Sequence, residues 1–337
     1  MTKVLEVKDM HTSFFTYAGE VKAVRGVSFD VELGEAVGFV GESGCGKSVT
    51  MLSVMGILDE VGKVTAGEII FNGKKLAGLS DRRMQKIRGN EMTMIFQDPM
   101  TSLNPVYTIG NQMIEHQIRH KKISKSEATK KAVDMLKLVG LPYPEKRIKQ
   151  YPHEFSGGMR QRAMIAMALV NNPKLLIADE PTTALDVTIQ AQILEVMKNI
   201  RKELDTSIIL ITHDLGVVAS ICDRVNVMYG GKIVETASAI EVYHNPKHPY
   251  TWGLLKSVPN PKKSSKEKLI PIEGQPPDLL KPPVGCPFTP RCEYSMRICE
   301  KEMPPEFKFE GDHRVACWLM HEKAPKLSLS STGKGGN

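Results

Sequence analysis

Short apolar runs alternate along the chain with longer amphipathic segments. Runs of strand length lie at 36–40, 92–96, 174–178 and 207–212. The stretch 185–204 instead repeats apolar residues at helical spacing, with Ile189, Ile193 and Ile200 on one face, so it predicts a helix packed on a sheet. A second helical pattern covers 125–139. Strands interleaved with helices predict an α/β fold.

Three regions and a C-terminal tail differ in their pattern of apolar and polar residues. Residues 4–96 look rich in strands, residues 98–170 look mainly helical, and residues 174–235 return to the strand pattern. After residue 257, prolines and lysines cluster, which is typical of an extended linker. We predict a main domain at 1–257 with a helical subdomain at about 98–170, a linker at 258–284, a small loop-rich module at 285–323 and a disordered tail at 324–337.

Residues 41–48 form a complete G-x-x-x-x-G-K-[ST] phosphate-binding loop, between a predicted strand and a helix expected at 49–57. Its glycines let backbone N–H groups turn toward a phosphate chain, and the helix N-terminus faces the anion. Lys47 supplies a cation for the β- and γ-phosphates, and Ser48 is a Mg²⁺ ligand. The predicted nucleotide-binding residues of the loop are Gly41, Ser43, Gly44, Cys45, Gly46, Lys47, Ser48 and Val49.

Polar residues end three of the apolar runs. Asp179 is placed to hold Mg²⁺. Glu180 points the other way, because successive side chains along a strand alternate in direction, and it can act as the catalytic base for an attacking water. Gln97 and His213 also follow strands, and ligands bind at the carboxyl ends of strands in such sheets. We therefore expect Gln97 to contact the metal and the water, and His213 to contact the γ-phosphate and Glu180.

A second anion site is predicted at residues 155–162, Phe-Ser-Gly-Gly-Met-Arg-Gln-Arg, which precede an apolar helix at 164–170. Over a hundred residues separate it from the phosphate-binding loop. A head-to-tail dimer would place Ser156, Gly157 and Gly158 of one chain on the nucleotide bound by the other.

Taken together, these motifs closely resemble the ABC ATPase family over about residues 4–260. The motifs follow the family order: the loop at 41–48, Gln97, the signature at 155–159, Asp179-Glu180, Ala184-Leu185-Asp186 and His213. The resemblance implies a RecA-like core, an antiparallel β-subdomain and a helical subdomain, with Asp186 beside the signature that acts in trans. One residue departs from the pattern, since Met159 stands where many relatives have glutamine.

The adenine contact is also implied by the resemblance. Family members stack the base on an aromatic residue about thirty positions before the lysine. Phe14, Phe15 and Tyr17 lie in that region, and Tyr17 has the best spacing. The alternative is that these rings pack the β-subdomain.

Composition and charge indicate the cellular location of the chain and the kinds of partner that it binds. No apolar stretch reaches the roughly 20 residues that span a bilayer, and no signal peptide is recognisable at the N-terminus. We expect a cytosolic chain without nucleic-acid partners, since basic and aromatic residues do not interleave. The formal charge of +7 equals the excess in 119–149, which is either a solvated helical face or a surface facing anionic lipid.

Four of the six cysteines, Cys286, Cys292, Cys299 and Cys317, follow the spacing C-x5-C-x6-C-x17-C. Disulfides are rare in a reducing cytosol, so four thiols in a small module favour a metal. The short knuckle of structural zinc sites is missing. Long, uneven spacing suits a [4Fe–4S] cluster, with zinc or free thiols as alternatives and His313 as a spare ligand. Cys45 and Cys222 are expected to be inert.

The C-terminal region resembles the extension of dipeptide and oligopeptide permease ATP-binding subunits, through residues 243–251 and Gly285-Cys286-Pro287-Phe288-Thr289-Pro290-Arg291-Cys292. Some members carry an iron–sulfur cluster there. The resemblance implies an ATP-hydrolysing importer subunit that uses ATP and Mg²⁺ at the cytoplasmic face of a prokaryotic membrane. Its expected partners are a second ABC ATPase subunit, two transmembrane permease subunits and, indirectly, an extracellular solute-binding protein. A nickel or other small-solute importer, a soluble non-transport ABC ATPase and a structural metal-binding adaptor are the alternatives.

Overall fold

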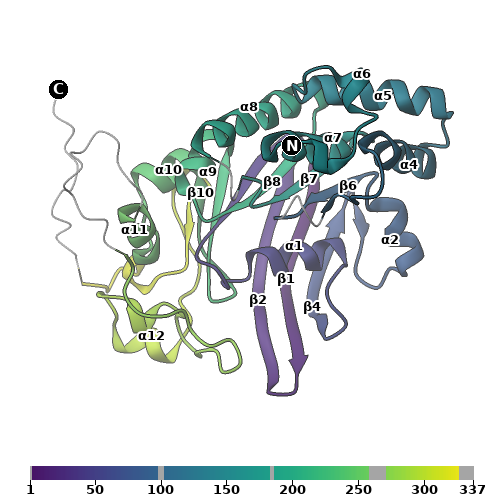
Figure 1. The fold of residues 1–337 in the computed structure, drawn as a ribbon. Coiled ribbons are helices and arrows are strands. Elements are labelled where there is room, and N and C mark those ends of the chain that lie inside the picture. The colour runs from purple at the N-terminus through teal and green to yellow at the C-terminus, as the bar shows by residue number, and fades with distance from the viewer. Residues whose placement is uncertain (1, 98–101, 183–185, 258–270, 326–337) are drawn as a thin grey trace, which may run out of the picture.

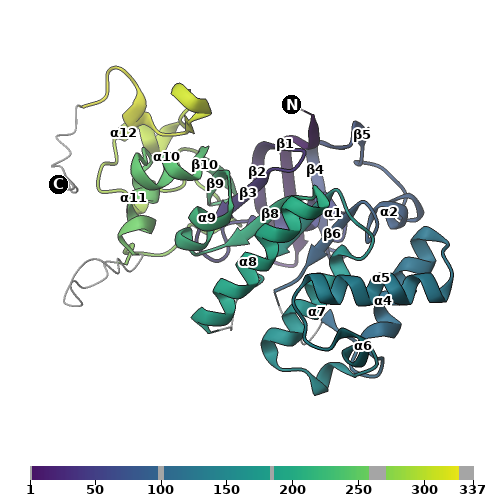
Figure 2. The same ribbon diagram turned by 90° about the horizontal axis from the view of Figure 1, so that it is seen from above.

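The protein is described by a computed structural model, which covers residues 2–97, 102–182, 186–257 and 271–325. Two sheets occupy the centre of the molecule (Figure 1). A group of helices lies at one end and the cysteine-rich C-terminal region at the other, and the view from above shows the same arrangement (Figure 2). The sheets therefore hold together two regions that are distant in the sequence.

The larger sheet has eight strands, in the order β11-β12-β10-β9-β3-β8-β7-β6. The strands from β9 to β6 run parallel, and β10, β11 and β12 pair antiparallel at one edge. Every residue of β3, β7 and β8 is buried, as expected for parallel strands covered on both faces. The strands are β3 (Ala36–Val40), β6 (Met92–Ile95), β7 (Leu175–Asp179), β8 (Ser207–Thr212), β9 (Arg224–Tyr229), β10 (Lys232–Ser238), β11 (Phe307–Lys308) and β12 (Arg314–Val315).

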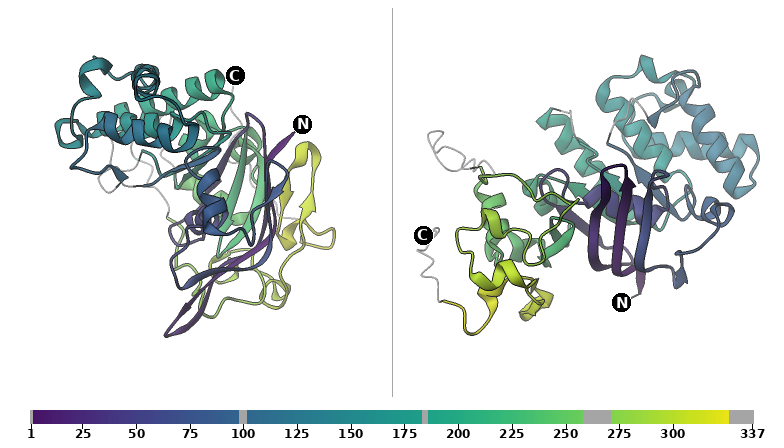
Figure 3. Two further views of the ribbon diagram at one scale, coloured as in Figure 1. Left: turned by 90° about the vertical axis from the view of Figure 1, so that its right-hand side faces the viewer. Right: turned by 90° about the horizontal axis from the view of Figure 1, so that it is seen from below.

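The smaller sheet is antiparallel, in the order β2-β1-β4-β5. Its strands are β1 (Lys3–Thr16), β2 (Gly19–Glu32), β4 (Gly62–Phe71) and β5 (Lys74–Lys75). Apolar residues of this sheet, such as Met10 and Phe29, share one buried cluster with Phe39 and Ile209 of the larger sheet. The small sheet therefore covers one face of the parallel core (Figure 3).

Most helices lie on the other face or at the ends of the sheet. The described helices are α1 (Lys47–Met55), α2 (Asp81–Ile87), α4 (Ile109–Lys121), α5 (Lys125–Leu138), α6 (Pro144–Arg147), α7 (Gly157–Leu169), α8 (Val187–Leu204), α9 (Leu215–Ile221), α10 (Ala239–His244), α11 (Pro249–Lys256) and α12 (Arg297–Lys301). Helices α4 to α7 form the group at one end of the molecule (Figure 2). None of the helices in the described ranges has the length and apolar character needed to cross a membrane.

The predicted strands are confirmed at β3 and β8, β6 ends one residue earlier than predicted, and β7 is displaced by one residue. Helix ends were harder to predict. Helix α1 begins at Lys47, inside the phosphate-binding loop, and α7 already begins at Gly157. The start of α8 is set by Asp186, whose carboxylate accepts the Ile189 N–H at 2.9 Å.

The described part of the predicted linker is packed against the main domain rather than free. The Lys22 N–H donates to the Leu279 carbonyl at 2.9 Å, and the Arg25 guanidinium donates to the Pro283 carbonyl at 2.7 Å. Farther along, Val315 of β12 pairs with Glu235 of β10, so the C-terminal module completes the larger sheet. These residues are extended rather than helical, as expected, but long-range hydrogen bonds pack them against the main domain.

Candidate functional site

The phosphate-binding loop connects β3 to α1, and its glycines are required by close backbone contacts. Gly46 has φ +102°, and a Cβ there would lie 2.6 Å from the Ala23 carbonyl oxygen. A Cβ at Gly41 would lie 2.2 Å from the Met228 carbonyl oxygen. By contrast, a Cβ at Gly44 would meet nothing within 4 Å. The loop is therefore packed on its protein side and open on the side of Gly44.

Lys47 lies within the loop that it is expected to serve. Its side chain is buried, and its ammonium group donates to the Gly41 carbonyl at 2.7 Å and to the Glu42 carbonyl at 3.0 Å. The ammonium group is thus held over the inner surface of the loop, where it can pair with a polyphosphate. Beside it, Cys45 is buried, and this burial raises the pKa of its thiol, so Cys45 is neutral there.

Ser48 and Asp179 meet in front of the loop. The Ser48 hydroxyl donates to Asp179 Oδ1 at 3.0 Å, although the two residues come from α1 and β7. Burial raises the pKa of Asp179, and the hydrogen bond from Ser48 opposes this effect. A hydroxyl and a carboxylate at this distance are the oxygen ligands that Mg²⁺ takes. The donor set therefore fits Mg²⁺, which Ser48 and Asp179 would hold.

Glu180 adopts a left-handed backbone conformation, with φ +45°. Strand β7 ends at Asp179, so the direction of the Glu180 side chain is set by this turn and not by the alternation of a strand. The reasoning from alternation was wrong. The two carboxylates nevertheless face different groups, as expected. Asp179 contacts Ser48, whereas Glu180 contacts Gln97 and His213.

Three neighbouring strands bring Gln97, Glu180 and His213 together. The strands β6, β7 and β8 are adjacent and parallel, so their carboxyl ends meet at one edge. Gln97 Nε2 donates to Glu180 Oε2 at 2.8 Å, and His213 Nδ1 lies 3.3 Å from Glu180 Oε1. The Glu180 carboxylate is held between an amide and an imidazole. This arrangement can orient a carboxylate toward a water molecule.

The Ser-Gly-Gly signature begins helix α7. Ser156 is exposed and caps the helix by accepting the Met159 N–H at 3.4 Å. No hydrogen bond joins Ser156 to residues 41–48 in the part of the chain that the structure describes. Met159, the departure from the family pattern, packs its side chain against the larger apolar core. The N-terminus of α7 is therefore exposed at Ser156 and Gly157.

Comparisons with known proteins agree with this geometry. Residues 24–183 match the family described as ABC transporter, and residues 234–299 match the oligopeptide/dipeptide transporter, C-terminal region. The oligopeptide transport ATP-binding protein of Bacillus subtilis is 58% identical over 328 residues, which cover 97% of this chain and 92% of that protein. The dipeptide transport ATP-binding protein of the same species is 56% identical over 335 residues, or 99% of this chain and 100% of that protein.

The chain belongs to the ABC transporter ATP-binding subunits of the oligopeptide/dipeptide permease family. Its fold is the P-loop ABC ATPase fold, and the protein is an ATPase. A solved dimeric ATP-binding cassette, in a post-hydrolysis state with ADP and Pi, covers 70% of this ATP-binding subunit and 98% of its own chain, at 30% identity and a TM-score of 0.62.

The three aromatic candidates for the adenine contact differ in exposure. Phe14 is half-buried against Gly62, and Phe15 is 48% exposed. Tyr17 lies at the β1–β2 turn of the ATP-binding subunit and is fully exposed. Of these rings, Tyr17 has the most surface free to stack on a base. Its role stays a prediction.

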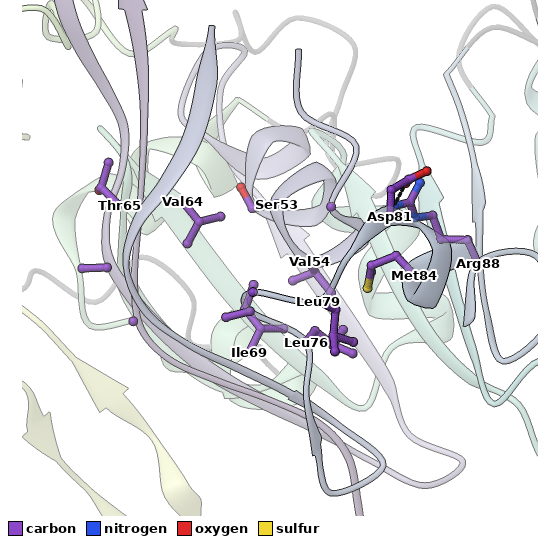
Figure 4. Close-up of a pocket in the computed structure, with 15 residues that line it drawn as sticks. Ser53, Val54, Val64, Thr65, Ile69, Leu76, Leu79, Asp81, Met84 and Arg88 are labelled. Carbon is purple, nitrogen blue, oxygen red and sulfur yellow. Dashed lines mark hydrogen bonds and ion pairs between the residues drawn. The ribbon is translucent and has the colours of Figure 1, made fainter. Parts of the chain in front are cut away.

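A pocket of about 420 Å³ lies between α1, β4 and α2 of the ATP-binding subunit (Figure 4). Val54, Ile69, Leu76 and Met84 line it, and an Asp81–Arg88 ion pair lies at its edge. None of the predicted nucleotide or metal residues borders this pocket. The phosphate-binding loop lies outside this pocket, and it is open on the side of Gly44.

The four C-terminal cysteines gather in one region of the ATP-binding subunit. Cys286, Cys299 and Cys317 are buried, and Cys292 is partly buried. Burial raises the pKa of Cys317 to about 12 and that of Cys292 to about 11, and the other thiols of the set contribute to both shifts. Within the described ranges, however, no group of three or more His, Cys, Asp or Glu side chains could hold a metal ion. The predicted metal-binding character of the module is not confirmed.

The expectation of His313 as a spare metal ligand is wrong, because its ring faces Glu235. Its ring is buried, and Nε2 lies 2.7 Å from Glu235 Oε1. Glu235 also accepts from the Thr251 hydroxyl and from the backbone N–H groups of Lys247 and His248. His313 therefore joins the C-terminal module to β10 through a buried carboxylate.

Sequence reasoning missed three residues at the loop. Arg291 and Tyr250, both from the C-terminal region, contact Glu42 inside the phosphate-binding loop. Glu42 occupies a variable position of the loop motif, and Arg291 stands beside Cys292. Arg291 and Tyr250 lie in the two C-terminal segments that carry the family resemblance, but nothing in those segments indicates a contact with the loop.

Proposed function

We propose that this ATPase is the motor subunit of an importer for oligopeptides or dipeptides. The observation that carries the proposal is the likeness at 58% and 56% identity to two peptide transport ATP-binding proteins, over nearly the whole chain. The match of residues 234–299 to the C-terminal region of oligopeptide/dipeptide transporters supports the proposal. A nickel or other small-solute importer is the second candidate, and a soluble non-transport ABC ATPase is less well supported.

Within one site, Lys47 and the loop bind the phosphates, and Tyr17 stacks on the adenine. Ser48 and Asp179, with help from Gln97, would hold Mg²⁺, which would supply positive charge to the phosphates. Glu180 is the base that takes a proton from the attacking water. Gln97 and His213 orient Glu180, and the distances of 2.8 and 3.3 Å support this assignment.

The complete site needs a second chain. We infer a head-to-tail pair in which Ser156, Gly157, Gly158 and Asp186 of one subunit face the nucleotide bound by the other. The exposed, capped N-terminus of α7 supports this arrangement. The partner is a second ABC ATPase subunit, either a homologous chain or another copy. ATP binding closes the pair, and hydrolysis lets the two subunits separate.

The pair drives two transmembrane permease subunits from the cytoplasmic face of a prokaryotic membrane, and an extracellular solute-binding protein delivers the solute. We place the transmission of motion near Gln97, because this residue links the base to the segment that enters the helical subdomain. Nucleic acid is not a partner.

For the cysteine module we propose a [4Fe–4S] cluster on Cys286, Cys292, Cys299 and Cys317. Four buried or partly buried free thiols within one small module would be stabilised by such a cluster. Backbone N–H groups of Phe288, Tyr294 and Leu319 point at three of the sulfurs and lower their pKa against the dominant effect of burial. Zinc on the same four thiols is the alternative, and the metal content of the purified protein decides between them.

The substrate is tested by uptake in the source organism. Deletion of this gene should abolish uptake of a labelled tripeptide and leave nickel uptake unchanged, and the wild-type gene should restore peptide uptake. Loss of nickel uptake with normal peptide uptake would instead support the second candidate. Normal uptake of both solutes would remove the transport assignment.

A further inference from the structure

Glu42 is the second residue of the phosphate-binding loop, and the C-terminal region holds it from two sides. Arg291, at the end of a 3₁₀ turn (Thr289–Arg291), forms a two-pronged ion pair with the Glu42 carboxylate, at 2.5 and 2.9 Å. The Tyr250 hydroxyl, from α11, accepts the Glu42 N–H at 2.7 Å. Both the side chain and the amide of this loop residue are therefore occupied.

The Glu42 backbone also contacts the phosphate-binding cation. Its carbonyl oxygen accepts from the Lys47 ammonium group at 3.0 Å. A single residue thus links Arg291 and Tyr250 on one side to Lys47 on the other. A displacement of Glu42 would move one of the two carbonyl groups that hold Lys47.

Arg291 is itself fixed. Its side chain is 3% exposed, and it donates to the Tyr229 hydroxyl and to the carbonyl oxygens of Ile272 and Glu273. A planar guanidinium with all its donors engaged holds a carboxylate in one orientation, which a lysine could not do. Arg291 also neutralises a carboxylate that would otherwise repel a polyphosphate.

We propose that Arg291 and Tyr250 are positioning residues for the phosphate-binding loop, so that the C-terminal module sets the affinity for ATP. They touch neither the phosphates nor the reacting water; they act through Glu42 on Lys47. This inference rests on the proposed binding of ATP by residues 41–48. It gives the module a role in the nucleotide site that does not depend on its metal content.

The test is steady-state hydrolysis of MgATP by purified full-length variants. Arg291→Gln should raise KM roughly tenfold and change kcat far less, because the chemical groups are untouched. Arg297→Gln, which removes an exposed arginine of the same module, is the matched control and should leave KM unchanged. A folded Arg291→Gln protein with the KM of the wild type would overturn the proposal.

A double-variant cycle separates positioning from general stability. If Arg291 acts through Glu42, Arg291→Gln should add nothing to KM in a Glu42→Gln background. An equal rise in KM in both backgrounds would show that Arg291 acts by another route and would overturn the proposal.

Tyr250→Phe covers the case in which Arg291→Gln does not fold. It should also raise KM, and an unchanged KM would count against the proposal. Lys47→Ala tests whether residues 41–48 bind ATP at all. If wild type and Lys47→Ala bind ATP equally well in thermal-shift titrations, the proposed ATP site itself has failed, and the role of Arg291 must be judged separately.

Discussion

At the scale of single residues, the chemistry depends on backbone conformations that a sequence does not display. The residue types at Asp179 and Glu180 indicated one metal ligand and one base. Their separation, however, comes from the left-handed conformation of Glu180, with φ +45°, directly after the strand. Such a conformation costs a non-glycine residue about 1 kcal/mol or more and persists where the surrounding structure enforces it.

Glu180→Gln keeps the shape of the side chain and removes the base. We expect turnover to fall by roughly 100-fold or more, while ATP binding persists. The measurement is phosphate release together with ATP-dependent thermal stabilisation. Glu203→Gln, on the exposed side of α8, serves as the control. Turnover near that of the wild type in Glu180→Gln would exclude Glu180 as the base.

The contact between Arg291 and Glu42 illustrates what could not be predicted at this scale. These residues are 249 positions apart, and neither belongs to a fixed position of the phosphate-binding motif. Only the folded chain brings them together.

At the scale of elements, strands were easier to predict than helix ends. The central parallel strands are covered on both faces, so they read as continuous apolar runs with sharp limits. Helix α7 was predicted from its apolar residues alone, yet it begins seven residues before 164, at Gly157, where Ser156 caps it. Its first turn begins with two glycines and is only partly buried, so an apolar pattern cannot detect it.

Ser156 can be tested without breaking its cap. Ser156→Asp and Ser156→Asn both keep a good capping side chain, but only aspartate adds a negative charge. If the signature faces a nucleotide in trans, Ser156→Asp should lower ATPase activity roughly tenfold or more relative to Ser156→Asn.

Both variants should bind ATP normally, as measured by thermal shift, because each chain's own loop is intact. Equal activity of the two variants would contradict an anion at this position. Gly158→Asp is a poorer probe, since a Cβ at Gly158 would lie 2.9 Å from Ile189 Cγ2 and disturb α8 directly.

His248, the N-cap of α11, makes stability depend on pH. Its Nδ1 accepts the Tyr250 N–H at 3.1 Å, and burial lowers its pKa to about 4. Between about pH 6.5 and pH 4, His248 is protonated in the unfolded chain but not in the folded chain. Folding stability therefore falls as the pH falls. We expect a loss of about 2 kcal/mol from this group between pH 7 and pH 5, measured by urea unfolding.

His248→Asn keeps a capping acceptor and removes the titrating ring. Between pH 7 and pH 5 this variant should therefore lose about 2 kcal/mol less folding stability than the wild type. Identical pH dependence in the two proteins would contradict the assignment. Burial raises the pKa of Glu235, but hydrogen bonds from His313 and Thr251 outweigh burial and keep this pKa below its usual value. The contribution of Glu235 to folding stability should therefore be lost only at more acidic pH.

At the scale of the whole molecule, the C-terminal module is part of the core and not an appendage on a spacer. The proline-rich composition after residue 257 favoured a free linker, because composition reports local preference. Pairing of β12 with β10 and the buried Glu235–His313 contact depend on residues about 80 positions apart, which no local pattern indicates. The order of the ATPase motifs, by contrast, was sufficient to predict the main fold.

The cluster proposal predicts brown colour, broad visible absorption and about four irons per chain after anaerobic purification. Cys286→Ser and Cys317→Ser should lose iron and destabilise the module, whereas Cys222→Ser, a buried cysteine outside the set, should keep it. Zinc without iron would exclude the cluster, and full retention of metal in both variants would remove the four-cysteine site.

The central claim is that ATP hydrolysis at this site drives peptide across a membrane. Its most direct test is accumulation of a labelled tripeptide in vesicles that contain the assembled transporter, its solute-binding protein and MgATP on the side of this subunit. We predict ATP-dependent accumulation with the wild-type chain and none with Glu180→Gln, although both bind ATP. Peptide accumulation that proceeds equally with Glu180→Gln, or ATP hydrolysis by the wild-type assembly without any peptide movement, would contradict the account.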